Sequence, residues 1–131
     1  MLINCVAYEN GAKLADIPVE SISDYISRPG CFVWVALSDA TPEELAVMQL
    51  EFGLHSLAVE DAQHGHQRPK VEEYGDSLFV VMHLVEPSDA GEQCIHVGEV
   101  DVFVGSNYVL SVRTVSYTHL RANETREDLV C

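Results

Sequence analysis

The fold is decided by residues 31–53, which read CFVWVALSDATPEELAVMQLEFG. The first part of this stretch, Cys31 to Leu37, is a continuous apolar run rich in β-branched and aromatic side chains. A turn pair, Pro29 and Gly30, precedes the run, and polar residues follow it. A short apolar run between turn residues is typical of a strand that is covered on both faces. The sequence therefore predicts a central, buried strand here.

The second part of the stretch predicts a helix with well-defined ends. Thr41 is suited to cap it, Pro42 to its first position, and Glu44 stands three residues after the cap, where it completes a capping box. Gly53 is suited to end the helix. Three apolar residues at helical spacing predict the buried stripe: Leu45, Met48 and Phe52.

The residues before this stretch predict a hairpin and a short helix. Leu2 to Tyr8 is β-prone, Asn10 and Gly11 form a strong turn pair, and a second short run extends from Lys13 to Ile17. The apolar residues of Val19 to Ile26 have helical spacing.

The residues after it predict one more helix and then strands. His55 to Ala62 is expected to be helical and Lys70 to Tyr74 extended. Three further strands, joined by turns, are expected at Ser77 to Glu86, Cys94 to Val104 and Tyr108 to Arg113. Helices early in the chain and antiparallel strands late in it predict an α/β fold, a mixed β-sheet flanked by helices.

The length of 131 residues suits one domain, which we expect to span residues 1–114. Val115 to Cys131 has no sustained amphipathic period. This tail also resembles one that recurs on unrelated reading frames, so we interpret it as a non-native or disordered segment. The alternative is a native C-terminal helix.

The charge balance bears on the partners of the chain. Lys and Arg number 7 against 21 Asp and Glu, for a net charge of −14. Such a chain repels nucleic acid. The acidic residues either form a solvated face that keeps the domain soluble or attract cations across an oligomer interface.

Targeting signals are not found in this sequence. No apolar run approaches the roughly 18 to 20 residues that cross a bilayer, and the N-terminus lacks the pattern of a signal peptide. We therefore expect a soluble, cytoplasmic chain. Its four cysteines, Cys5, Cys31, Cys94 and Cys131, include no CxxC pair, which argues against a disulfide framework and a thiolate zinc site. The first three are expected to be small buried hydrophobes.

Two adjacent carboxylates, Glu60 and Asp61, are the candidate metal ligands. Mg²⁺ keeps much of its water, so one or two carboxylates suffice when a second chain supplies the rest. The alternative is a solvated pair that interacts with Arg68 or Lys70.

The nearby histidines His64 and His66 suggest zinc or copper, although a histidine pair in a loop is more often polar surface. His55, His83 and His96 are expected to be helix-terminal or strand-surface residues. The sequence has no phosphate-binding glycine loop, GxSxG elbow or HExxH helix, so no enzyme is predicted, and a hydrolase would need a nucleophile and a base brought together by folding.

One contiguous region resembles a known family. Leu57 to Asp61 reads LAVED and Gln67 to Glu72 reads QRPKVE, with Tyr74 and the strand around Phe79 at the expected distances, and Trp34 further upstream. These residues resemble the N-terminal cytoplasmic domain of CorA magnesium and cobalt transporters, over about residues 1–114. Ser56 is a departure, since many relatives have proline there.

The resemblance implies an α/β/α funnel domain of a homopentamer in the inner membrane. It implies Mg²⁺, and also Co²⁺, as the ions concerned, with Asp61 as an acidic ligand of a weak regulatory site and Glu60 beside it. The membrane helices and the Gly-Met-Asn motif of the family have no counterpart in this sequence. We therefore expect the regulatory part of a divalent-cation transporter, cut before its pore. The alternative is a free-standing acidic metal-binding or interaction domain.

Overall fold

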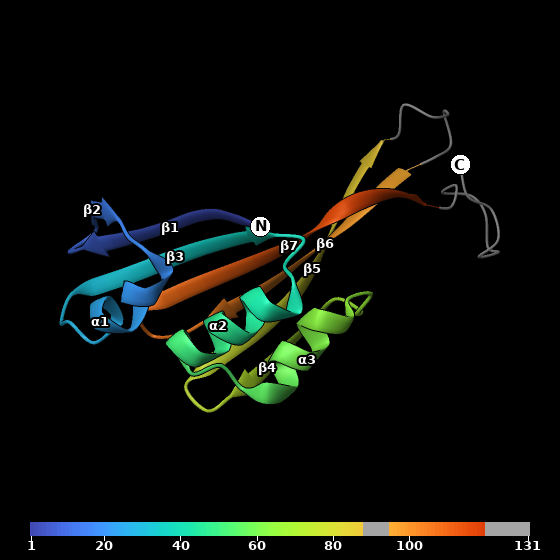
Figure 1. Ribbon diagram of the computed structural model, residues 1–131. Helices are drawn as coiled ribbons and strands as arrows, with labels where there is room; N and C mark the ends of the chain where they lie inside the picture. Colours follow the sequence, from blue (N-terminus) through green and yellow to red (C-terminus); the bar gives the residue numbers. More distant parts are fainter. Residues whose placement is uncertain (88–94, 120–131) are drawn as a thin grey trace.

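The computed structural model describes residues 1–87 and 95–119, which form a seven-stranded mixed sheet and its helices (Figure 1). The strand order is β2-β1-β3-β7-β6-β5-β4. All neighbouring strands are antiparallel except β3 and β7. The elements in chain order are β1 (Leu2–Glu9), β2 (Ala12–Asp16), the 3-10 helix η1 (Val19–Ser21), α1 (Ile22–Ile26), β3 (Cys31–Ser38), α2 (Pro42–Phe52), α3 (Ser56–His64), β4 (Lys70–Tyr74), β5 (Ser77–Pro87), β6 (Ile95–Val104) and β7 (Tyr108–His119). The predicted α/β fold with a mixed sheet is confirmed.

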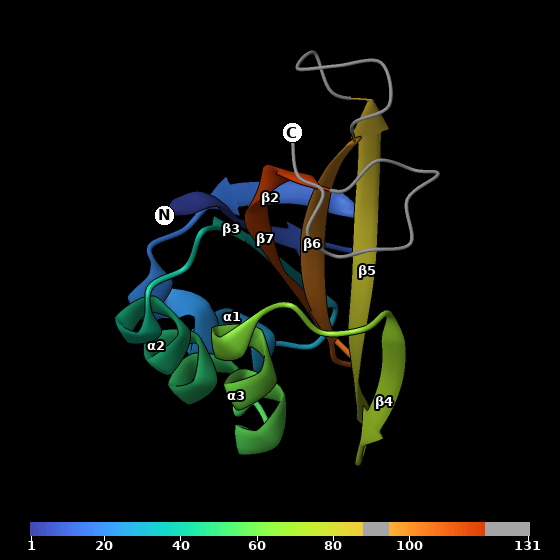
Figure 2. The same ribbon diagram turned by 90° about the vertical axis from the view of Figure 1, so that its right-hand side faces the viewer.

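The helices lie on one face of the sheet (Figures 1 and 2). Along β3 the side chains alternate, so that Val33 and Val35 are buried while Phe32 and Trp34 are only half-buried. The prediction that this strand is buried on both faces is therefore wrong. The α/β/α arrangement implied by the resemblance has a second helical layer, which is not found in the part of the chain that the structure describes.

The core lies between the sheet and the three helices. The largest fully buried side chains include Phe79, Ile22, Leu45 and Leu110. Burying each such side chain contributes about 1.5–3 kcal/mol to folding. The Phe79 and Phe103 rings lie 4.9 Å apart, which places an aromatic pair under the β5–β6 half of the sheet.

The predicted capping box of α2 is confirmed. The Thr41 hydroxyl accepts a hydrogen bond from the Glu44 amide at 3.1 Å, and the Glu44 carboxylate accepts one from the Thr41 amide at 2.9 Å. The hydrogen bond from the Thr41 backbone is the main reason why the pKa of Glu44 is lowered. Gly53 ends the helix with φ of 70°, in the left-handed region.

Two elements differ clearly from the predictions, whereas the bounds of the others agree within two residues. The helix predicted for Val19 to Ile26 is divided into η1 and α1. The last strand was predicted to end at Arg113 but continues to His119, because β6 begins early enough for Ile95 to pair with His119. The backbone of residues 115–119 thus belongs to the sheet, and residues 120–131 lie outside the described residues. The domain boundary at residue 114 stays a prediction.

Two of the four cysteines lie in the described part of the chain, and their burial agrees with the prediction. Cys5 and Cys31 are free and buried, as predicted. Burial is the main cause that raises the pKa of the Cys5 thiol to about 11. A thiol that stays protonated is a poor metal ligand, which agrees with a packing role. Cys94 and Cys131 lie outside the described residues.

The length of β7 leads to a prediction about truncation. A chain that ends at Thr114 loses the pairing of residues 115–119 with β6, including Val97 with Tyr117 and Ile95 with His119. Each lost backbone hydrogen bond costs about 0.5–1.5 kcal/mol. We expect its melting midpoint to lie below that of a chain ending at His119 by about 5 °C or more in thermal unfolding monitored by circular dichroism. Equal midpoints for the two chains would show that this end of β7 adds nothing to stability.

Candidate metal centre

Asp61 lies in α3 and faces β4. The packing of α3 explains this direction, since Ala58 and Val59 are buried on its inner side and Ala62 packs against the core. Successive helical residues are turned by about 100° from one another, so Glu60 points away and is exposed. The two adjacent carboxylates therefore do not converge on one point.

A lysine holds the Asp61 carboxylate. Lys70 Nζ lies 2.8 Å from Asp61 Oδ2 and 2.8 Å from Glu72 Oε1. The Lys70 and Asp61 side chains are 29% and 31% exposed, so water reaches the pair but does not surround it. Hydrogen bonds to Asp61 and then to Glu72 hold the pKa of Lys70 above its ordinary value. The sequence suggested Arg68 and Lys70 as possible partners of Asp61, and the structure shows an ion pair with Lys70.

The geometry of β4 explains why Lys70 reaches two carboxylates. Residues two apart in a strand point to the same face, so Lys70 and Glu72 are side by side while Val71 and Glu73 are exposed on the other face. An ammonium group between two carboxylates leaves this trio with one net negative charge. The arrangement can attract a cation, but any cation that binds Asp61 directly must compete with Lys70.

The two histidines near Asp61 border a different hollow. His64 and His66 line a cavity of about 230 Å³ together with Asp39 and Glu99. Within residues 1–87 and 95–119, no three His, Cys, Asp or Glu side chains come together in a way that could hold a metal ion. In the described part of the chain, the histidine pair is thus not joined by the further ligands that zinc or copper would need.

His55 caps the helix that carries Asp61. Its Nδ1 atom accepts a hydrogen bond from the Leu57 amide at 3.1 Å. Its ring also stacks on Tyr74 of β4, with centroids 4.3 Å apart. The residue is helix-terminal, as predicted, and α3 begins at Ser56. The start of α3 and the strand that carries Lys70 are therefore tied together by one side chain.

Sequence reasoning missed two carboxyl groups on β6. Glu99 and Asp101 are 5% and 2% exposed and lie on the helix-covered face of the sheet. A signal was present in the sequence, because two acidic residues two apart in an apolar strand, EVDVFV at 99–104, must face the same side. Gln67 was noted only for the resemblance, yet its backbone amide donates a hydrogen bond to Glu99 Oε1 at 3.0 Å.

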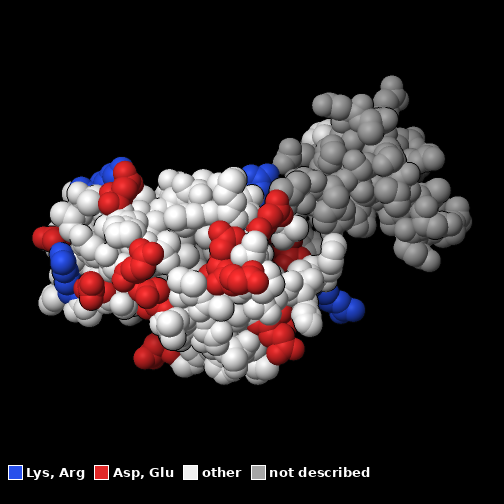
Figure 3. Space-filling view, in the orientation of Figure 1, with Lys and Arg blue, Asp and Glu red and all other residues white. Residues whose placement is uncertain are grey.

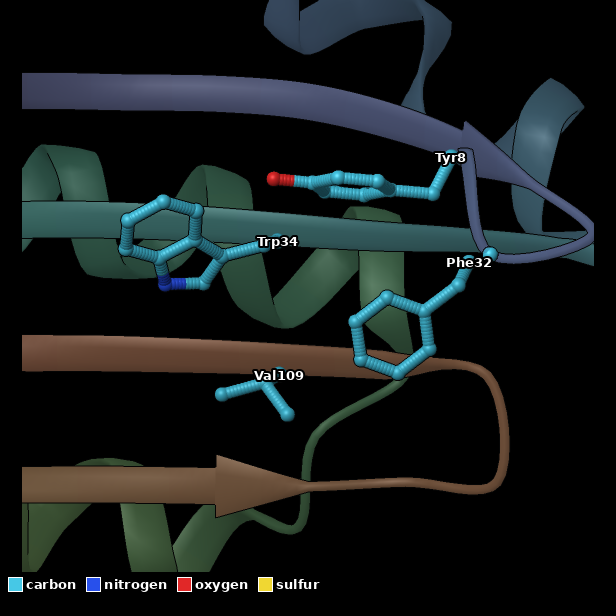
Figure 4. A pocket seen from close by; sticks show the side chains of 5 residues that line it. Tyr8, Phe32, Trp34 and Val109 are labelled. Carbon is cyan, nitrogen blue, oxygen red and sulfur yellow. The ribbon is translucent and has the colours of Figure 1, made fainter. Parts of the chain in front are cut away.

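The open face of the sheet carries an apolar groove of about 450 Å³. Tyr8, Phe32, Trp34 and Val109 line it from three strands, and their side chains stand over the sheet in Figure 4. The Tyr8 and Phe32 rings meet edge-on with centroids 6.4 Å apart. The groove contains no charged side chain and so offers nothing to hold a metal ion.

The surface on the helical side is strongly acidic. Figure 3 shows Asp and Glu side chains spread over this face, with few Lys or Arg between them. Part of the acidic excess of the chain is therefore displayed at the surface that carries α2 and α3. A charge of this sign raises the local concentration of cations.

Comparison with known proteins identifies the family. The family described as "CorA-like Mg2+ transporter protein" matches residues 30–126, which is more than half of the chain. The chain belongs to this family. Among curated relatives, "Putative metal ion transporter YfjQ" of Bacillus subtilis (strain 168) is 29% identical over 99 residues, which are 75% of this chain and 28% of the relative. The family is one of transporters rather than of enzymes.

Solved structures agree on the fold. The full-length CmaX protein aligns with 87% of this chain at a TM-score of 0.62 and 19% identity. The soluble domain of CorA from Methanocaldococcus jannaschii aligns with 88% at a TM-score of 0.55 and 20% identity. The chain covers 35% and 43% of these two structures, and thus spans less than half the length of the proteins it matches. No helix in the described part of the chain is long and apolar enough to cross a membrane.

The capping role of His55 leads to a prediction about α3. His55→Ala removes both the cap of the helix and the stacking on Tyr74, so it should lower the free energy of unfolding by about 1–3 kcal/mol. His55→Asn keeps a capping oxygen and should recover the part due to the cap. Urea unfolding of the three proteins measures this. Equal loss in both variants would show that only the ring contact matters.

Proposed function

We propose that this chain is the N-terminal regulatory part of a divalent-cation transporter of the inner membrane, on its cytoplasmic side, with Mg²⁺ and Co²⁺ as candidate ions. Membership of the CorA-like Mg²⁺ transporter family carries the proposal. The likeness of the fold to the soluble domain of CorA supports it. In the whole protein, the membrane-spanning pore would lie outside these residues, and the parent would be a homopentamer.

Within this function, Asp61 with Glu60 as its neighbour is proposed as half of a weak Mg²⁺ site. Asp61 is 31% exposed and already bound to an ammonium group, which makes it a position where positive charge is favourable. Mg²⁺ demands octahedral coordination and gives up water reluctantly, so one carboxylate on one chain binds it poorly. A carboxylate from a neighbouring subunit would complete the site, and the cation would offset repulsion between acidic domains.

Competition between Lys70 and Mg²⁺ can be tested on this chain alone. Lys70→Gln leaves Asp61 and Glu72 without their shared cation, so Mg²⁺ should raise the melting midpoint of this variant more than that of the wild type. Asp61→Asn combined with Lys70→Gln should abolish the additional rise. Glu73→Gln is a matched control, since it removes a carboxylate from the exposed face of the same strand. An equal effect of Mg²⁺ in all four proteins would show only general screening of charge.

The regulatory role needs the full-length transporter. We expect Mg²⁺ to protect its cytoplasmic domain from protease, and Asp61→Asn to weaken this protection while leaving the fold intact, because the amide keeps the size of the side chain and removes its charge. Limited proteolysis at increasing Mg²⁺ concentration measures the effect. Protection that rises equally in the wild type and in Asp61→Asn would assign Asp61 to the solvated acidic surface.

The second candidate is a free-standing acidic metal-binding or interaction domain. Genomic sequence downstream of the codon for Thr114 separates the two. A long helix followed by two apolar spans supports the transporter, whereas an early stop codon supports the free-standing domain.

A further inference from the structure

Two acidic side chains are buried next to each other on β6. Glu99 is 5% exposed and Asp101 is 2% exposed, and they are the buried charged residues among those the structure describes. Asp and Glu are almost never fully buried unless they are paired. Each of these two therefore needs a partner that satisfies its oxygens.

The neighbouring strands do not supply such a partner for Asp101. Its cross-strand neighbours are Val81 on β5 and Val112 on β7, and both are buried. One oxygen of Glu99 accepts the hydrogen bond from the Gln67 amide. The other oxygen, Oε2, and Asp101 Oδ1 are buried without a hydrogen-bond partner.

The two carboxyl groups lie on the same face of β6, because the residues are two apart in one strand and both are buried. A hydrogen bond between them is one of the causes that raise the pKa of Asp101. An ionised carboxylate has only acceptor oxygens, whereas a protonated one can also donate. Two carboxylates in contact thus repel one another unless a positive charge lies between them, and a shared proton is the smallest such charge.

We propose that Glu99 and Asp101 hold one proton between them, as a carboxylic acid and a carboxylate, and that this proton fixes the segment connecting α3 to β4. A metal ion in its place is not favoured. Within the described residues, no third His, Cys, Asp or Glu side chain joins these two in a group that could hold a metal ion, and Mg²⁺ requires six oxygen ligands in near-ideal octahedral geometry.

The surroundings favour the protonated form. Burial is the main cause that raises the pKa of Asp101 to about 8, followed by the hydrogen bond to Glu99 and the charges of Glu99 and Asp61, while Lys70 acts in the opposite direction. The other charged or titratable groups on this side come from β4, from β5 and from the rim of the cavity beside Glu99: Glu72, His83, His64, His66 and Asp39.

The pair holds the connecting segment through Gln67. The backbone amide of Gln67 donates a hydrogen bond to Glu99, and the backbone carbonyl oxygen of Gln67 accepts one from His83 Nε2 at 2.7 Å. Both polar groups of this one peptide residue are thus bound to the sheet. Loss of the proton would set two negative charges in contact, so Glu99 would move away and its bond to Gln67 would weaken.

The effect on stability has a definite sign. In the unfolded chain Asp101 releases its proton near the ordinary pKa of about 3.9. In the folded chain it keeps the proton up to a pKa of about 8. Between these values the folded chain holds one more proton than the unfolded chain, so stability falls as the pH rises through this window and levels off above it.

The test compares the 131-residue chain with Asp101→Asn, in which an amide replaces the acid and can donate to Glu99 without a proton. In NMR, the resonance of the Gln67 backbone amide in the wild type should shift with pH, with a midpoint near the Asp101 pKa of about 8. In Asp101→Asn it should not titrate there. The infrared band of a protonated carboxyl group should be present at pH 7 in the wild type and lost in the variant.

Thermal unfolding gives an independent readout. Between pH 5 and pH 8 the midpoint of the wild type should fall relative to that of Asp101→Asn by about 5 °C or more. Glu73→Gln, which removes an exposed carboxylate, should follow the wild type. If Asp101→Asn does not fold, Glu99→Gln provides the same test, since its amide also donates within the pair while its oxygen still accepts from Gln67.

Two results would overturn the proposal. One is a Gln67 resonance that titrates in the same way in the wild type and in the neutral variant. The other is a resonance that is unchanged by pH but shifts on addition of Mg²⁺ at pH 7, which would place a metal ion rather than a proton between the two carboxylates.

Discussion

The parallel pairing of β3 with β7 is the constraint on which the rest of the structure depends. It extends from Val33 opposite Tyr108 to Ser38 opposite Arg113. On one side of it lies the N-terminal part of the sheet, β2-β1-β3, and on the other the antiparallel part, β7-β6-β5-β4. Each part alone would leave an unpaired edge and half of a core. Joined, they bury Val33, Val35 and Leu110 completely beneath the helices.

That pairing also determines where the polar groups meet. With β7 held beside β3, β6 and β5 follow in order, and α3 lies over the part of the sheet that β4 completes (Figure 2). Asp61 from the helix then meets Lys70 from the strand, and Glu99 and Asp101 lie buried on the same face of β6. The structure thus contains both an exposed acidic surface and a buried acidic pair, and the backbone amide of Gln67, in the segment between α3 and β4, is bonded to the buried pair.

How much of the site could be predicted depends on how far apart in the sequence the interacting residues are. The caps of α2 and α3 are local, and Thr41 and His55 are found at helix ends as predicted. The partner of Asp61 is nine residues away in another element. The sequence narrowed it to Arg68 or Lys70, but only the pleat of β4 decides that Lys70 and Glu72 share the face turned to the helix. The pairing of Glu99 with Gln67 spans 32 residues, and no local pattern indicates it.

The sequence by itself determined the element types, the capping box, the Asn10–Gly11 turn, the excess of acidic charge and, through the QRPKVE and LAVED motifs, the family. These features depend on backbone preferences and on residues close together in the chain. Only the tertiary structure decided that the helices cover one face of the sheet, that β7 continues to His119, and that Glu99 and Asp101 are buried on the same face of β6. The physical reason is that burial and strand length depend on which distant strands pair, and the free energy of a charge depends on what surrounds it after folding.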